Sequence, residues 1–374
     1  MKKILHIPKY YLPHTGGIEY VCYQIVTNLK DFAHAVVCFN DEKNTVIEEY
    51  EGIHIVRCGF WKKIKGFAIS FCYYKHLKRA IKQFKPDIIH FHAPNPVAML
   101  YLLWLIPKPT KLIVHYHAKI AIFEILYPFY KLFESMLFRR ANTICVTSPL
   151  LLNNIRELAP YRGKSITIEN IISTTDLDVS TEEDKARIEV LKEKYGNKKI
   201  VFTFGRHVYY KGFNYLIEAD QYIDKNCEII IGGTGPIAEK LKQMTSSKRI
   251  HFVGRISDND LKYYLHAADV FAFPSINKAE AFGLALAQAM YCYTPAVTFT
   301  IIKSGVNYVN LDKITGLEVE NQNVHKLAEA INQLLIDEKL RRELSSNAHQ
   351  RVVENFTMEC IKSKLISVYN SLLE

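Results

Sequence analysis

Short apolar runs alternate with longer amphipathic segments along most of the chain. Runs without polar interruption are typical of strands that are buried on both faces of a parallel sheet. In the first half of the chain we expect such strands at residues 3–8, 35–40, 53–58, 87–92, 111–117 and 143–148. Segments between them, such as 68–84 and 122–140, have helical periodicity. This alternation predicts a doubly wound α/β fold.

The alternation is interrupted between residues 150 and 198, where the chain becomes polar, and it then resumes. We expect further strands at 200–206, 227–233, 249–254, 269–275 and 294–299, and helices at 322–336, 337–355 and 358–373. The pattern therefore predicts two α/β domains in tandem, at residues 1–172 and 173–357. A chain of 374 residues is long enough for both.

The formal net charge of +10 is concentrated in one part of the chain. Residues 51–140 hold 15 Lys and Arg against 4 Asp and Glu. Such an excess suits nucleic acid, an anionic membrane surface or anionic substrates. We expect no nucleic-acid partner, because no recognition motif accompanies the charge.

The cysteines and the apolar runs indicate where the protein resides. None of the eight cysteines forms a C-x-x-C pair, so we expect free thiols in a reducing cytosol and no zinc site. The most apolar run, VAMLYLLWLI at 97–106, has ten residues, too few to cross a bilayer. The N-terminal apolar run ends at Pro8, too early for a signal peptide. A cytoplasmic or peripheral protein is the expectation.

Four segments with candidate chemistry lie at turns between a strand and a helix, where doubly wound sheets bind ligands. They are Gly16-Gly17, FGRHVYYKG at 204–212, IIIGGTGP at 229–236 and PSINKAEAFGLALAQAM at 274–290. Glycines allow close backbone approach to a ligand. Arg206 and Lys211 suit a diphosphate. Glu280 precedes a helix whose first amides suit an anion.

These segments occur in an order that resembles a retaining GT-B glycosyltransferase of family 4. The resemblance rests on Gly-Gly-Ile-Glu early, Gly-Arg-x4-Lys-Gly midway and Glu-x2-Gly late, and it covers nearly the whole chain. His115-Tyr116-His117 and Val146-Thr147-Ser148-Pro149 also match. It implies two Rossmann-like domains that face each other across a cleft. The first would be the acceptor side, with helix 358–374 packed back onto it, and the second would bind the nucleotide sugar.

The resemblance also implies roles for individual residues. The catalytic set would be His117, Arg206, Lys211 and Glu280. The donor- and nucleotide-binding set would be Gly16, Gly17, Gly205, Gly233, Val253, Arg255, Phe282, Gly283, Leu284 and Gln288. Glu19 and His92 would lie on the acceptor side. In this set Arg206 and Lys211 would bind the leaving diphosphate, Glu280 would bind sugar hydroxyls, and the loop at Val253 and Arg255 would contact the base.

The chain departs from the family pattern at one position. Gln288 stands where the family has a second glutamate that binds the ribose hydroxyls. An amide can still donate and accept a hydrogen bond, but it lacks the charge of a carboxylate. Fixed cations and amide dipoles stabilise the departing diphosphate, so we expect no metal and no cofactor beyond the substrate nucleotide sugar.

The expected reaction is transfer of a hexose from a nucleotide-diphosphate sugar to a lipid-linked or growing saccharide in bacterial surface polysaccharide synthesis. The string SGVNYVN at 304–310 resembles that of polysaccharide mannosyltransferases and favours GDP-mannose. The alternatives are a UDP-sugar donor, a GT-B nucleotide-sugar epimerase and a degenerate, non-catalytic GT-B protein.

Residues 60–85 combine Lys and Arg with Trp, Phe and Tyr. Lysines meet anionic lipid headgroups, and aromatic rings sit at the membrane interface. We expect the basic stretch at 60–67 to be followed by a helix at 68–85, and a peripheral contact with the cytoplasmic face of the inner membrane. The alternative is an ordinary solvated helix face.

Overall fold

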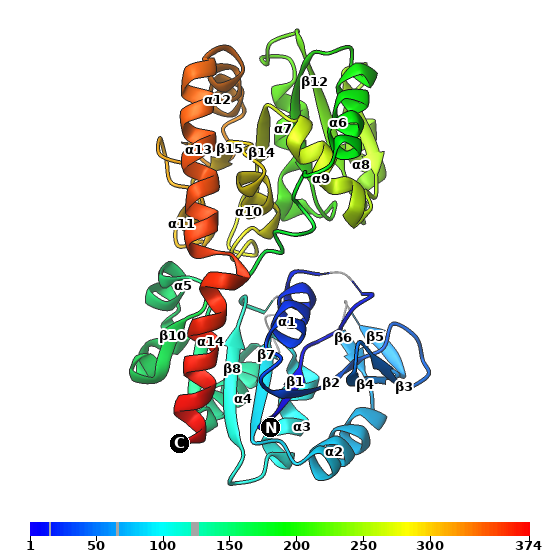
Figure 1. Cartoon of the computed structure of the whole chain (residues 1–374), viewed down its shortest axis with the longest axis vertical. Helices are drawn as coiled ribbons and strands as arrows, with labels where there is room; N and C mark the ends of the chain where they lie inside the picture. Colours follow the sequence, from blue (N-terminus) through cyan, green and yellow to red (C-terminus); the bar gives the residue numbers. More distant parts are fainter. Residues whose placement is uncertain (15, 65–66, 121–126) are drawn as a thin grey trace. The chain divides into compact units, whose positions relative to one another are not determined.

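The computed structural model describes residues 1–14, 16–64, 67–120 and 127–374, which form two compact units. Unit 1 comprises residues 1–171 and 358–374, and unit 2 comprises residues 172–357. Each is built on a wholly or largely parallel sheet with helices on both faces (Figure 1). The chain therefore has the α/β class that its apolar runs predict.

Unit 1 has an eight-stranded sheet in which only β3 is antiparallel to its neighbour. In sheet order the strands are β10 (Ser165–Thr167), β9 (Thr143–Val146), β8 (Lys111–Tyr116), β7 (Ile88–Ala93), β1 (Lys3–Ile7), β2 (Ala33–Phe39), β4 (Ile53–Cys58) and β3 (Val46–Tyr50). The strand order reverses between β1 and β7. Their loops meet there, because the Asn95 amide donates to the carbonyl of Pro8 at 3.1 Å.

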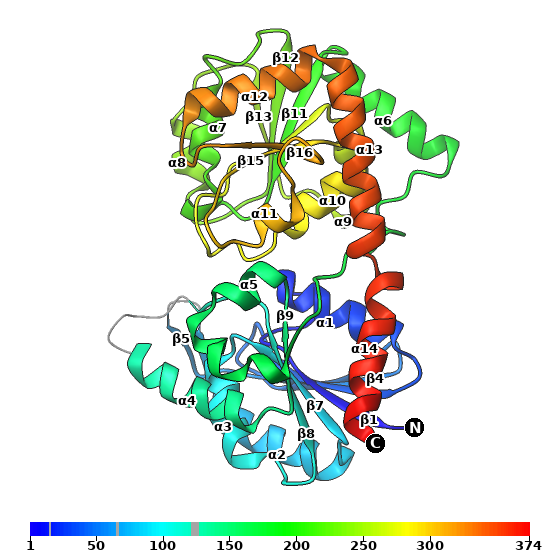
Figure 2. The same cartoon turned by 90° about the vertical axis from the view of Figure 1, so that its left-hand side faces the viewer.

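Helices cover both faces of this sheet (Figure 2). They are α1 (Gly17–Asn28), α2 (Cys72–Phe84), α3 (Pro96–Leu105), α4 (Tyr127–Arg140), α5 (Pro149–Asn154) and α14 (Met358–Leu373), with a 3-10 helix at Arg156–Lys164. An aliphatic and aromatic core fills the space between the sheet and α2, α3 and α4. On the opposite face, α14 places Tyr369 against His90, and Lys364 pairs with Glu169 at 2.8 Å.

Unit 2 has six parallel strands. In sheet order they are β13 (Ile250–Gly254), β12 (Cys227–Gly232), β11 (Lys199–Phe204), β14 (Val270–Phe273), β15 (Ala296–Phe299) and β16 (Gly316–Val319). Counted along the unit, this is the order 3-2-1-4-5-6 of a dinucleotide-binding sheet. The order reverses between β11 and β14, which makes the loops after these two strands the place to look for a ligand.

Two apolar clusters lie on the two faces of the unit 2 sheet, one under each helical layer. The helices are α6 (Glu182–Lys194), α7 (Phe213–Ala219), α8 (Ala238–Gln243), α9 (Asp258–Ala267), α10 (Leu284–Tyr291), α11 (Val306–Val309), α12 (Val324–Ile336) and α13 (Glu338–Asn355). Helix α6 begins in a capping box, in which the side chains of Thr181 and Asp184 each bond the other's backbone amide. That cap and the helix lie within the polar stretch at which the domain boundary was expected.

The expected helix at 68–85 begins too early. Residues 62–64 (β5) and 67–69 (β6) pair as a two-stranded antiparallel hairpin, and α2 starts only at Cys72. Ser70 terminates the hairpin, since its hydroxyl bonds the carbonyl of Gly59 at 2.5 Å and receives the amide of Tyr73 at 3.2 Å. Lys65 and Gly66 of the basic stretch, and residues 122–126 of the helix expected at 122–140, lie outside the described residues.

Candidate active site

The loop after β11 brings two cations to the switch point of unit 2. Arg206 is exposed, whereas the Lys211 side chain is 13% exposed. A single 3-10 turn at Tyr209–Lys211 ends at Gly212, which has a left-handed φ of +65°. A Cβ on Gly212 would lie 2.0 Å from the carbonyl oxygen of Pro274, so this loop packs directly on the loop after β14. Glycine is required there for both reasons.

The loop after β14 supplies the partner of Lys211. Glu280 Oε2 lies 2.5 Å from Lys211 Nζ and accepts a bond from the buried Ser275 hydroxyl at 3.1 Å. Burial has the largest single effect and lowers the pKa of Lys211, but the Glu280 carboxylate and Tyr210 together raise it by more, so the net pKa lies above its usual value. Lys211 is therefore charged. The sequence predicted that both residues act but not that they bind each other.

A second segment holds the Glu280 loop from behind. The Ser304 hydroxyl donates to the carbonyl of Glu280 at 2.5 Å, and the Gly305 amide donates to that of Ala281 at 3.1 Å. A Cβ on Gly305 would lie 2.1 Å from the Ala281 carbonyl oxygen. Ser304 and Gly305, at the start of the SGVNYVN string, thus fix the backbone that carries Glu280.

Helix α10 begins directly after this loop. Phe282 is buried, and Gly283 has a left-handed φ of +92° at the N-cap. The amides of the first turn, beginning at Leu284, have no acceptor within the helix, and the helix dipole favours an anion beside them. Gln288 lies one turn further along α10 and is partly exposed.

Glycines in the third loop serve close packing between loops. A Cβ on Gly233 would lie 1.9 Å from the carbonyl oxygen of Gly205, and the Gly233 amide donates to the carbonyl of Gly254 at 2.6 Å. The loops after β11, β12 and β13 are therefore packed backbone to backbone at one edge of the sheet. A Cβ on Gly205 would lie 3.8 Å from Lys211 Nζ, within the same loop.

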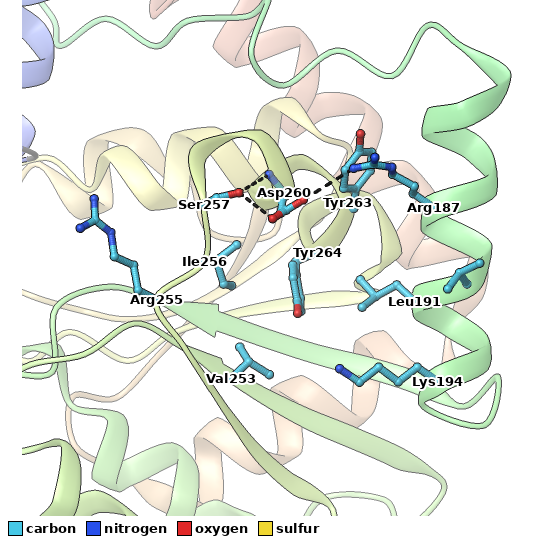
Figure 3. Close-up of a pocket in the computed structure, with 11 residues that line it drawn as sticks. Arg187, Leu191, Lys194, Val253, Arg255, Ile256, Ser257, Asp260, Tyr263 and Tyr264 are labelled. Atoms are coloured by element: carbon cyan, nitrogen blue, oxygen red, sulfur yellow. Dashed lines mark hydrogen bonds and ion pairs between the residues drawn. The ribbon is translucent and has the colours of Figure 1, made fainter. Parts of the chain in front are cut away.

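A pocket of about 300 Å³ lies beside the loop after β13 (Figure 3). Its walls come from this loop, from α6 and from α9, and they include Val253, Arg255, Lys194 and Tyr264. Arg187 and Asp260, 3.8 Å apart, close one side. The two residues expected to contact the base therefore line a common pocket. Arg206, Lys211 and Glu280 do not line it.

In unit 1, Gly16 and Gly17 lie at the start of α1, at the carboxyl edge of the sheet. A Cβ on Gly16 would lie 2.3 Å from Oε2 of Glu19, which folds back over the first turn of the helix. Burial raises the pKa of the Glu19 carboxyl. Glu19 thus occupies the space beside the first-turn amides of α1.

His92 and His117 are neighbours at the same edge of the unit 1 sheet. His92 Nδ1 lies 3.0 Å from His117 Nε2, and both rings are buried. Burial lowers the pKa of His117 to about 4, partly offset by the side chain of Asn170, whose oxygen is 3.3 Å from Nδ1. His117 is therefore neutral at physiological pH.

Two protein-family models match the chain one after the other. Residues 15–176 match the model described as Glycosyltransferase Family 4, and residues 184–351 match the one described as Glycosyl transferases group 1. The chain is a family 4 glycosyltransferase. The expected family and enzyme class are confirmed, and the glycosyltransferase transfers a sugar from a nucleotide-sugar donor with retention.

Known relatives resemble this glycosyltransferase over its whole length. The O-antigen chain mannosyltransferase C of Escherichia coli is 27% identical, covering 100% of this chain and 99% of that protein. The D-rhamnosyltransferase WbpZ of Pseudomonas aeruginosa is 27% identical, with 95% and 92% covered. Among solved structures, a sucrose-phosphate synthase from Thermosynechococcus elongatus has a TM-score of 0.82 at 19% identity, covering 100% and 99% of the two chains. HepE of Anabaena, in complex with UDP-glucose, has a TM-score of 0.80 at 18% identity, with 99% and 100% covered.

Sequence reasoning about the glycosyltransferase missed several residues of the site. Ser275 and Asn170 bind the side chains of candidate residues, and Ser304 binds the backbone beside one. His6 and His34 lie in the same layer as His92. The His-x-His spacing in two strands was a visible signal for such a layer, since alternate residues share a face. The contacts of the serines and of Asn170 arise only through folding and left no comparable pattern.

Proposed function

We propose that this glycosyltransferase transfers mannose from GDP-mannose to a lipid-linked or growing saccharide in bacterial surface polysaccharide synthesis. The observation that carries the proposal is the Lys211–Glu280 pair at the β11–β14 switch point, beside the exposed Arg206 and the first turn of α10. The two full-length relatives named for O-antigen mannosyl transfer and D-rhamnosyl transfer support the choice of sugar and pathway.

The proposed reaction uses positive charge at the leaving group. Cleavage of the sugar–phosphate bond places negative charge on the diphosphate, which Arg206 and Lys211 stabilise together with the α10 amides. Lys211 already has a counter-ion in Glu280, so the donor phosphate shares the cation rather than meeting it unpaired. This arrangement keeps Lys211 protonated and in place in the empty site. Glu280 then has a second oxygen for a sugar hydroxyl.

The remaining candidate residues have supporting roles in this proposal. The nucleobase lies by Val253 and Arg255, the ribose by Gln288, and the sugar beside His117 and the glycines at the start of α1. Glu19 and His92 belong to the acceptor side in unit 1. These roles follow the family pattern, and the observed burial and loop packing are compatible with them.

We also propose that unit 1 contacts an anionic membrane surface where the acceptor lipid resides. In α2 the residues Tyr73, Leu77 and Ile81 face the core, whereas the other side of the helix is exposed and basic. Lys75, Lys78, Arg79 and Lys82 lie there. Large apolar side chains with exposed fractions of 59–82% flank the hairpin and lie on α3 and α4: Trp61, Phe71, Trp104, Phe129 and Leu132. None of the described helices is long and apolar enough to cross a membrane.

Transfer from labelled donors tests the proposed function. The full chain is incubated with vesicles that carry a polyprenyl-linked saccharide and with labelled GDP-mannose, UDP-glucose or UDP-N-acetylglucosamine. Incorporation from GDP-mannose alone supports the proposal. Incorporation from a UDP-sugar would instead support the alternative donor class, which HepE binds in its complex with UDP-glucose. Release of a free epimer would indicate an epimerase.

A further inference from the structure

Six buried histidines form a polar layer on one face of the unit 1 sheet. They are His6 on β1, His34 on β2, His90 and His92 on β7, His115 on β8 and His117 just after it. Parallel register places His6 beside His90 and His92 beside His115, so their side chains share a face. Each is at most 7% exposed. The other face of the same strands packs in the aliphatic core.

Four of these imidazoles form one hydrogen-bonded chain that crosses the sheet. It begins at the carbonyl of Leu29, 2.8 Å from His34 Nε2. His34 Nδ1 is 3.0 Å from His6 Nε2, His6 Nδ1 is 3.4 Å from His92 Nε2, and His92 Nδ1 is 3.0 Å from His117 Nε2. The chain ends at Nδ1 of His117, beside the Asn170 amide.

The Leu29 carbonyl gives this chain a direction. A carbonyl oxygen only accepts, so His34 Nε2 must carry hydrogen and Nδ1 of a neutral His34 must accept. His6 then donates through Nε2 to His34, and its Nδ1 must accept from Nε2 of His92. In the same way, Nδ1 of His92 accepts from Nε2 of His117. Each neutral ring is thereby fixed as the Nε2–H tautomer, and the lone pair at the end of the chain is on Nδ1 of His117. The Asn170 oxygen, 3.3 Å from this nitrogen, also only accepts, so the two ends of the chain compete. The Leu29 contact is the shorter, at 2.8 Å, and a backbone carbonyl cannot turn, whereas rotation of the Asn170 amide presents its NH2 group instead.

Burial keeps these rings neutral, so each ring carries a hydrogen on only one of its two nitrogens. Desolvation lowers the pKa of His6, His34, His92 and His117 below the usual value, and the neighbouring histidines lower those of His6 and His92 further. Around this chain, Cys22 of α1 lies near His6 and His92, while Tyr369 of α14, His90 and His115 form a separate branch. The pKa values of the Cys22 thiol and the Tyr369 hydroxyl are raised by burial, so both groups stay protonated.

A metal ion fits this layer poorly. His90, His92 and His115 bring one nitrogen each within 4.8 Å of the others, yet the rings of His90 and His92 are stacked at 4.5 Å with an angle of 5°. Lone pairs lie in the ring plane, so those of parallel rings do not converge on one ion. His90 Nε2 is also already bonded to His115 at 3.2 Å.

We propose that His34, His6 and His92 are positioning residues that fix the tautomer of His117 from the opposite edge of the sheet. They leave Nδ1 of His117 as an acceptor at the carboxyl edge. When the Asn170 amide is turned so that its NH2 group replaces the oxygen, this nitrogen receives a bond from it, and a substrate hydroxyl takes the same place when it binds. Binding of a substrate hydroxyl at this nitrogen rests on the proposed function, which puts His117 beside the sugar. The tautomer of His117 is independent of the proposed function.

Nitrogen-15 NMR of the full chain, labelled in its histidine rings, tests this. The resonances are assigned by single substitutions of His6, His92 and His117. The expected result is the Nε2–H tautomer at all three positions near neutral pH. An Nδ1–H tautomer at any of them would overturn the proposal, and so would a shift of these resonances on addition of Zn²⁺ alone, which would reveal a metal site.

Two variants separate positioning from mere packing. His34→Phe removes the anchor to Leu29, and we expect a measurable Nδ1–H population at His117, three hydrogen-bonded links away. His34→Gln offers an amide NH2 to Leu29 and an oxygen to His6, so it should restore the wild-type pattern. Tyr369→Phe, the matched control in the other branch, should leave His117 unchanged. A His117 ring that stays wholly Nε2–H in His34→Phe refutes the proposal, and if that variant does not fold, the wild-type tautomers decide.

Turnover of the same variants tests the link to function separately. We expect His34→Phe to lower kcat several-fold with little change in KM for the donor, because the change is in the acceptor lone pair of His117 and not in the diphosphate site. A tautomer change without any loss of kcat would leave the histidine chain standing and would remove His117 from the reaction.

Discussion

Mild acid should destabilise unit 1 through its histidine layer. The pKa values of all six buried histidines are lowered by burial, so these rings are neutral in the folded protein but take up protons in the unfolded chain below about pH 6.5. The unfolded state then binds more protons than the folded state. The free energy of unfolding therefore falls as the pH falls, by about 1.4 kcal/mol per pH unit for each ring.

Two carboxyl groups of unit 1 act in the opposite direction. Burial raises the pKa of Glu134 to about 7 and also raises that of Glu19, so the folded state binds these protons more readily and gains stability as the pH falls towards 4.5. Between pH 7.5 and 5.5 each ring that stays neutral in the folded state costs about 1.4 kcal/mol, so six cost at most about 8 kcal/mol, while Glu134 returns about 2 kcal/mol. The expected net loss of several kcal/mol is a large part of the whole stability of a small domain.

Urea unfolding at pH 7.5, 6.5 and 5.5 measures this loss. Hydrogen exchange, corrected for intrinsic rates and read peptide by peptide, follows β1, β7 and β8 of unit 1 separately from β11 and β12 of unit 2. His115→Leu should reduce the pH slope of unit 1 by about one proton, or 1.4 kcal/mol per pH unit. His54→Gln, at an exposed position on β4, is the control. A unit 1 stability that changes by less than about 1 kcal/mol over this range would refute the reasoning.

Three further predictions concern the donor site and the membrane face. Lys211→Ala and Arg206→Ala should each lower kcat by about 100-fold or more, measured as product formed at saturating donor, because each removes a cation from the leaving diphosphate; near-normal rates in both would contradict the assignment. Gln288→Glu should tighten nucleotide binding several-fold in calorimetry, by adding a charged acceptor for the ribose hydroxyls, and unchanged affinity would place the ribose elsewhere. The triple variant Lys75→Glu, Lys78→Glu and Lys82→Glu should no longer pellet with anionic vesicles, whereas its behaviour with neutral vesicles should match that of the wild type. Retained pelleting with anionic vesicles would show that α2 is not the membrane contact.

The sequence predicts the strands of this fold wherever both faces of a strand are buried. It does not reveal β3, because Val46–Tyr50 is exposed on almost every residue and carries no apolar run. The pattern assigns residues 68–69 of β6 to a helix, since the basic and aromatic residues there lack a strand-like alternation and the strand ends at the long-range contact of Ser70 with Gly59. Edge strands and hairpins are defined by pairing, which local patterns reflect weakly.

The candidate site shows the same division between local and long-range information. The local motifs identify Arg206, Lys211 and Glu280. The contact between Lys211 and Glu280 joins positions 69 residues apart, so no local pattern predicts it. The histidine chain likewise requires the register of β1, β2, β7 and β8, which brings His6 and His34 to the spaced histidines of β7. Residue types were predictable, whereas the partners that set their charge and tautomer were not.

Nucleotide binding to the full chain tests the central claim most directly. Thermal unfolding is followed with GDP and with UDP at equal concentrations, for the wild type and for Lys211→Ala, since a ligand that binds only the folded state raises the melting temperature with its concentration. The account predicts a larger rise with GDP than with UDP in the wild type, and loss of that rise in Lys211→Ala. A larger rise with UDP would contradict the proposed donor, and an equal rise in Lys211→Ala would contradict the site.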